Sequence, residues 1–209
     1  NHRASFFALS EASLGDPIDW HRDYSSGLIG PKKYSAFINC RDASRVGDVK
    51  YIWELNRLQH LVVLALASAW TGLGAHDKEI QDQISSWRKQ NPFMIGLNWK
   101  SPLEAGMRLI SWALVSFVMG KSNGENIFNK QFPEAIYQHQ YFIRKFYSKH
   151  SSANNHLVGE MAGLYVASVF WPYYRESSSW RAFAHEKLVE EIVRQVEADG
   201  VGKERASAA

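Results

Sequence analysis

The residues best suited to chemistry lie in the segment 151–160, which reads Ser-Ser-Ala-Asn-Asn-His-Leu-Val-Gly-Glu. Asn154 and Asn155 are adjacent amides, and His156 follows them just before an apolar run at 161–171. Small polar residues ahead of such a run predict the start of a helix. A helix N-terminus carries free backbone N–H groups and a partial positive charge, so this end suits an anion.

The side chains of this segment add donors and a proton carrier. Asn side chains supply neutral N–H donors that can hold a carboxylate. His156 can donate or accept a proton near neutral pH, and Glu160, four residues on, shares its helix face. The competing interpretation is structural, because Asn is a common helix cap and a single His often packs against its neighbours. Spacing alone leaves both interpretations open.

Two further Glu/Arg pairs lie in apolar helical segments. Glu54 and Arg57 are three residues apart, and Glu104 and Arg108 are four apart, so each pair can form an intrahelical ion pair. Burying a single charge is costly, so the structural interpretation is a pair of ion pairs that lock helix to helix. The functional interpretation is that an Arg faces a groove and meets an acidic sugar. Gly106, in mid-helix, predicts the close approach of another element.

Composition limits the classes that fit. The chain has 209 residues, 45% hydrophobic and 22% charged, with a net charge of +3 that is spread rather than clustered, so no nucleic-acid partner is expected. Cys40 is the only cysteine, which excludes an intramolecular disulfide and argues against a thiolate metal cluster. No signal peptide is visible, and the apolar run 61–70 is too short to cross a membrane, so no membrane insertion is expected.

From residue 48 onward the pattern is helical. The predicted helices are 49–70, 77–90, 102–119, 133–150, 155–171 and 179–198, with the sequence Ser-Pro-Leu-Glu at 101–104 forming a capping box. Helices in series joined by short connections predict an all-α fold of antiparallel hairpins. Residues 1–47 are expected to form an irregular segment packed on the helices, with 34–39 as a short strand or extended piece.

Three motifs carry a resemblance to a known family. The segments 53–57, 101–108 and above all 152–160 resemble the heparinase II/III-like polysaccharide lyases and their alginate lyase relatives, and Asp199-Gly200-Val201 with Glu204 resembles the segment that closes the same block. The resemblance implies that 48–209 is part of an incomplete (α/α) toroid. It also implies that the chain is a truncated fragment of a larger α+β lyase, whose C-terminal β-sandwich domain is absent here.

The chemistry implied by the resemblance is β-elimination at a uronic acid of an anionic polysaccharide, with no cofactor or metal. Asn155 would neutralise the carboxylate, with His156 beside it as neutraliser or proton acceptor. The remaining family positions are expected to support these groups or to contact substrate: Asn154, Glu160, Arg57, Arg108, Asn56, Trp53 and Glu104. The family's acid/base Tyr lies beyond Glu204, so the 209 residues alone are expected to have little or no activity.

Three other interpretations remain. A glycoside hydrolase would need paired carboxylates. A metal site would use His156 and Glu160, with His139 or His150. The chain could also be a non-catalytic glycan-binding or scaffold module in cell-envelope polysaccharide handling. The resemblance favours a periplasmic or secreted bacterial protein.

Overall fold

The computed structural model describes residues 2–72, 75–123, 128, 132–149, 155–197 and 199–201. Strands β1 (His2–Phe6) and β2 (Leu9–Gly15) pair antiparallel in a two-stranded sheet. Two 3-10 turns, η1 and η2, and the main helices follow: η1 (Ser35–Phe37), α1 (Ala43–Val46), α2 (Val49–Asn56), α3 (His60–Thr71), α4 (Ala75–Gln90), η2 (Leu97–Trp99), α5 (Pro102–Asn123), α7 (Pro133–Phe146), α8 (Asn155–Phe170) and α9 (Ser177–Gln195). The all-α prediction is confirmed, with the small sheet as an addition.

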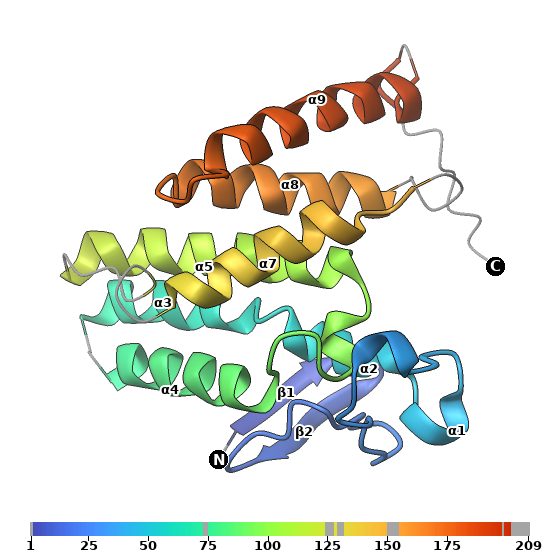
Figure 1. Cartoon of the computed structure of the whole chain (residues 1–209). Coiled ribbons are helices and arrows are strands. Elements are labelled where there is room, and N and C mark those ends of the chain that lie inside the picture. The colour runs from blue at the N-terminus through green and yellow to red at the C-terminus, as the bar shows by residue number, and fades with distance from the viewer. Residues whose placement is uncertain are drawn as a thin grey trace.

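The longer helices form hairpins, α3 with α4, α5 with α7 and α8 with α9, and the two helices of each hairpin run in opposite directions (Figure 1). The first helices of the three hairpins, α3, α5 and α8, run the same way, and α5 contacts both of the others. The predicted antiparallel hairpins are therefore present. The toroid that the resemblance implies stays a prediction.

Glycines bring α5 and α8 into close contact. A Cβ added to Gly106 would lie 2.8 Å from the carbonyl oxygen of Gly159, and one added to Gly163 would lie 2.4 Å from the Cα of Gly106. A Cβ on Gly159 would meet the side chain of Leu103. The backbones of the two helices thus touch directly, which confirms the prediction made from Gly106. The order of these contacts also shows that the two helices start at the same end of the layer.

The predicted single helix at 49–70 is wrong, because it is interrupted between α2 and α3. Leu58 has a φ of 59°, in the left-handed region that a right-handed helix does not contain. Its side chain is fully buried, and this burial offsets the cost of the backbone conformation. The helix α2 therefore ends at Asn56, and α3 begins separately at His60.

Several helix ends also differ from the prediction. The helix α5 continues past Gly120 to Asn123, because Gly120 does not take the left-handed conformation of a helix-ending glycine. The helix α7 ends at Phe146, four residues before the predicted end at position 150, and Tyr147 has an extended conformation. The helix α9 begins two residues before its predicted start and ends three residues before its predicted end.

The N-terminal segment contributes to the main core. Residues 2–15 form the β-hairpin, which the sequence analysis did not predict, and residues 34–39 contain the turn η1 rather than a strand. Tyr34 alone makes an isolated antiparallel bridge, to Ile95. Leu14 and Trp20 are buried in the same cluster as the apolar residues of the helices. The division at residue 47 stays a prediction.

The helix α5 is the most central element. By length and composition alone its residues Pro102–Gly120 could cross a membrane, but 61% of that window is buried, and α5 packs against α3, α7 and α8. Its place in the core accounts for its apolar composition.

Candidate active site

The helix α8 begins at Asn155, as the sequence predicted. Asn155 and His156 are both exposed in its first turn, next to the backbone N–H groups that a helix leaves unpaired at its N-terminus. Asn154 lies outside the described residues, as do His150 and Glu204. The first turn of α8 therefore presents an amide and an imidazole to solvent at an end that favours negative charge.

Glu160, in the next turn of α8, holds this first turn in place. Its carboxylate is fully buried, and its two oxygens accept hydrogen bonds from the backbone N–H and the hydroxyl of Ser148, at 2.7 Å each. Burial raises the pKa of Glu160, while the bonds from Ser148 and the nearby charge of His156 act in the opposite direction. Glu160 thus ties the start of α8 to the segment that follows α7, and its oxygens face Ser148 rather than solvent.

An ion-pair cluster lies at the start of α5. Arg57 donates from Nε and Nη2 to the two oxygens of Glu104, at 2.9 and 3.1 Å, and from Nη1 to Glu54 at 2.9 Å. Glu104 is 1% exposed, whereas Arg57 and Glu54 are about one quarter exposed. The pairing raises the pKa of Arg57, chiefly through the hydrogen bond to Glu104. A bidentate pair of this kind is geometrically well defined.

The ion-pair cluster and the start of α8 belong to the same end of the molecule. Leu103, next to Glu104, contacts Gly159, and Asn155 lies one helical turn before Gly159, about 6 Å along the axis. The structure therefore places Glu104, with its partner Arg57, at the start of α5 and places Asn155, His156 and Glu160 in the first two turns of the neighbouring α8. These residues come from three separate motifs of the sequence.

Arg108 lies elsewhere, in the interior. Its side chain is fully buried, donating from Nε to Nε2 of His139 at 3.0 Å and from Nη2 to the carbonyl of Asn98 at 2.7 Å. Glu104 does pair with an arginine, but with Arg57 rather than Arg108, so the predicted Glu104–Arg108 ion pair is wrong. Burial lowers the pKa of Arg108 to about 9. Arg108 packs over the ring of Trp87 and holds α5 to α7 and to the chain before α5.

Trp53 and Asn56 have structural partners. The Trp53 indole donates to the carbonyl of Leu97 at 3.0 Å. The Asn56 amide is fully buried and donates to the carbonyls of Trp20 and Ile52, while its oxygen accepts from the indole of Trp87. Asn56 therefore joins the N-terminal segment, α2 and α4 inside the core.

The environment of His139 requires a neutral ring. Because Arg108 Nε is a donor, His139 Nε2 accepts, and Nδ1 donates to the carbonyl of Ala135 at 2.8 Å. Burial first, and then the charge of Arg108, hold the pKa of His139 well below 6.5. A proton added to Nε2 would face the guanidinium with no acceptor.

This geometry predicts a pH dependence of stability. Above pH 6.5 the ring is neutral in both the folded and unfolded states, so it adds no slope. Below pH 6.5 the unfolded chain takes up a proton that folded His139 does not. We therefore expect the unfolding free energy to fall by up to about 1.4 kcal/mol per pH unit for this group. Urea unfolding at pH 8.0, 6.5 and 5.5 measures the slope.

A pair of variants isolates the contribution of His139. His139→Gln keeps an acceptor for Arg108 but cannot titrate. The unfolding free energy of this variant should therefore depend less steeply on pH below 6.5 than that of the unchanged protein. His185→Gln, at an exposed position on α9, is the control that removes a histidine without touching Arg108. Equal slopes in the two variants would contradict the assignment of a neutral His139.

The two other catalytic interpretations find little support in this geometry. Glu104 is held by Arg57 and Glu160 by Ser148, so neither carboxylate is poised for the acid/base work of a hydrolase. Within the described ranges no group of three or more His, Cys, Asp or Glu residues could hold a metal ion.

Sequence reasoning missed Ser148 and the link from His139 to Arg108. Ser148 pairs with Glu160, 12 positions away, and His139 pairs with Arg108, 31 positions away. Neither pairing has a local signal, although the buried position of His139 on the apolar face of α7 follows from helical spacing.

The fold and these first turns describe a helical-hairpin domain that presents amide, imidazole and helix N-terminal donors at one end. Residues 3–208 match the family described as Heparinase II/III N-terminus, and the chain belongs to that family. A heparin-sulfate lyase of Pedobacter heparinus is 26% identical over 162 residues, which cover 75% of this chain and 24% of that relative. The chain thus spans about a quarter of the length of the relative. No solved structure matches the chain.

Proposed function

We propose that the full-length protein containing this chain is a polysaccharide lyase that cleaves a uronate-containing anionic polysaccharide by β-elimination. Removal of the C5 proton and cleavage of the C4–O4 bond leave a C4–C5 double bond and a protonated O4. In this proposal Asn155 neutralises the uronate carboxylate, and His156 assists as a second neutralising group or as the proton acceptor. In this proposal the residue that protonates O4 belongs to another part of the full-length protein.

The observation that carries the proposal is the exposed Asn155–His156 pair at the start of α8. The C5 proton is weakly acidic, and neutralising the adjacent carboxylate stabilises the negative charge that builds up as the proton leaves. An amide and helix N–H groups can do this without bringing a new charge into the site. Membership of the Heparinase II/III N-terminus family supports the same reaction class.

The surrounding residues have supporting roles in this proposal. Glu160, held by Ser148, fixes the orientation of the first turn of α8. Arg57 adds positive charge at the neighbouring first turn of α5, although Glu104 and Glu54 already offset it. Arg108 stabilises the fold rather than contacting substrate, because it is buried against His139.

The direct test is an elimination assay with the full-length protein. Heparan sulfate, chondroitin sulfate and alginate are offered separately, and the ultraviolet absorbance of the unsaturated product is followed. The name of the heparin-sulfate lyase relative makes a sulfated glycosaminoglycan the first substrate to try. We expect turnover on at least one of these polymers. Binding of a polymer without any unsaturated product would instead support a glycan-binding module.

A periplasmic or secreted location belongs to the same proposal, because an enzyme that cleaves an anionic polysaccharide acts where that polymer is found, outside the cytoplasm. Fractionation of the source cells, with detection of the full-length protein in each fraction, tests it. Recovery in the cytoplasmic fraction alone would contradict it.

A further inference from the structure

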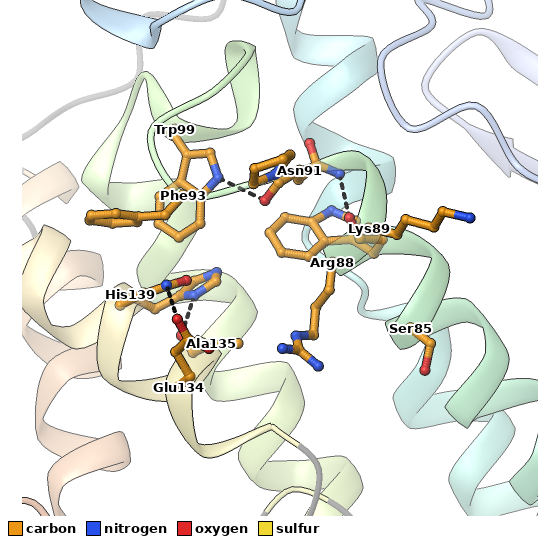
Figure 2. A pocket seen from close by; sticks show the side chains of 12 residues that line it. Ser85, Arg88, Lys89, Asn91, Phe93, Trp99, Glu134, Ala135 and His139 are labelled. Atoms are coloured by element: carbon orange, nitrogen blue, oxygen red, sulfur yellow. Dashed lines mark hydrogen bonds between the residues drawn. The ribbon is translucent and has the colours of Figure 1, made fainter.

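A cavity of about 430 Å³ lies between α4 and α7 (Figure 2). The last turns of α4, the chain that follows it and the first turns of α7 form its walls. None of its described lining residues is among those proposed to act at the start of α8. The cavity is therefore a second candidate site, on another pair of helices.

The walls of the cavity combine basic and aromatic groups. Arg88 extends into the space between α4 and α7, and Phe93 and Trp99 form an aromatic wall on the other side (Figure 2). Trp99 is 2% exposed and meets the partly exposed Phe93 ring edge to face, with their centroids 5.0 Å apart, so Trp99 supports a Phe93 ring that faces the cavity. Flat aromatic surfaces are suited to the apolar faces of sugar rings, and a guanidinium binds carboxylate or sulfate.

The positive charge continues beyond the cavity. Lys89 extends away from Arg88 and also lines a neighbouring hollow together with Lys32 (Figure 2). Among the described residues that line the two hollows, Glu134 is the one carboxylate, against the three basic side chains. The hollow that Asp16, Glu79 and Asp82 line is, by contrast, acidic. The carboxylates thus gather in that hollow, whereas the two hollows that share Lys89 are mainly basic.

Arg108 adds a buried charge behind the floor of the cavity. Its partners His139, Trp87 and Trp99 all line the cavity, and its guanidinium lies 4.8 and 5.7 Å from the ring centroids of the two tryptophans. Its Nη1 is buried and has no hydrogen-bond partner among the described residues. Within the part of the chain that the structure describes, no carboxylate is bonded to Arg108, because Glu104 is held by Arg57. In a low-dielectric interior such a charge attracts an anion at the nearby surface.

We propose that the cavity between α4 and α7, with the adjoining hollow at Lys32, binds a segment of anionic saccharide chain without acting on it. The anionic character of the ligand follows from the lining. Its identity as a saccharide rests on the proposed function. The site would hold a carboxylate or sulfate at Arg88 and stack one sugar ring on Phe93, which the buried Trp99 supports, away from Asn155.

The test uses a matched pair of double variants in the full-length protein. Arg88→Gln with Lys89→Gln removes two charges from the site. Lys78→Gln with Arg181→Gln removes the same two types of charge from exposed positions on α4 and α9. A sulfated, uronate-containing octasaccharide is titrated into each by calorimetry, in an Asn155→Ala background so that its cleavage is slow during the titration. We expect binding about tenfold weaker for the first pair and within about twofold for the second.

Two further measurements keep the outcomes apart. Phe93→Ala, which removes the aromatic wall without changing charge, should weaken octasaccharide binding by several fold. With Asn155 intact, the Arg88/Lys89 pair should lower kcat/KM for the polymer but leave that for a tetrasaccharide unchanged. Equal binding by the two double variants would overturn the proposal, and so would an equal loss on the tetrasaccharide, since the cavity would then be part of the catalytic site. Weaker binding in a protein that eliminates nothing would retain this site and reject the lyase function.

Discussion

Asn155→Ala in the full-length protein is expected to lower kcat/KM for elimination by about 10²- to 10³-fold, the usual cost of removing one donor that stabilises developing negative charge. The loss should appear mainly in kcat, because the amide interacts most strongly with the carboxylate as charge moves onto it. Oligosaccharide affinity should be largely kept, since other contacts hold the chain. Initial rates from the absorbance of the unsaturated product measure the effect.

Two controls support the interpretation of that result. The Asn155 side chain is exposed, so the unfolding midpoint of the variant should be close to that of the unchanged protein. Asn155→Asp keeps the size but places a negative charge beside the uronate, and it should lose at least as much activity as Asn155→Ala. Asn39→Ala, at another exposed amide, should leave the rate unchanged. Retention of elimination within about threefold in Asn155→Ala would remove Asn155 from the mechanism.

Gly163→Ala is expected to destabilise the fold by about 3 kcal/mol or more, the upper part of the range for overpacked sites. The new methyl would lie 2.4 Å from the Cα of Gly106, 2.6 Å from its carbonyl oxygen and 2.7 Å from its carbonyl carbon. All three atoms belong to the backbone of α5, so no side-chain rotation can relieve the clash. The helices must move apart, and the burial between them is lost. Urea unfolding followed by circular dichroism measures the change.

A second glycine provides a matched control on α5. A Cβ added to Gly120 would meet nothing within 4 Å. Gly120→Ala should therefore be neutral or stabilising by about 0.5 to 1 kcal/mol, through the lower conformational entropy of the unfolded chain. If Gly163→Ala and Gly120→Ala unfold at the same urea concentration, α5 and α8 do not pack as closely as described.

The sequence carried enough information for the long helices and little for their interruptions. Apolar periodicity and the Asn91-Pro92 stop located α4, and the Ser-Pro-Leu-Glu segment located the start of α5. The break at Leu58 could not be predicted, because leucine rarely takes a left-handed conformation and its burial, a tertiary effect, supports it here. The β-hairpin was missed because its burial pattern alternates only in part and lacks a strong turn signal.

The candidate site was predictable where its signals are local. The start of α8 at Asn155 and the close approach at Gly106 both followed from residue types within one helix. The partner of Glu104 did not, since Arg57 lies 47 residues away and competes with Arg108, which is nearer in sequence. The solvent exposure of an arginine is likewise a property of the packed structure, and Arg108 is buried because His139 and Asn98 supply its acceptors.

The common direction of α3, α5 and α8 brings three helix N-termini to one rim of their layer. Each N-terminus carries about half a positive elementary charge, but the hairpin partners α4, α7 and α9 run the other way and place their negative ends on the same rim. The helix dipoles of each hairpin therefore largely cancel at long range, and what remains is the short-range attraction of the unpaired N–H groups in each first turn. This attraction is built into the backbone, so it persists at every pH and survives any single side-chain replacement. A carboxylate would be attracted by it only once it is seated beside Asn155.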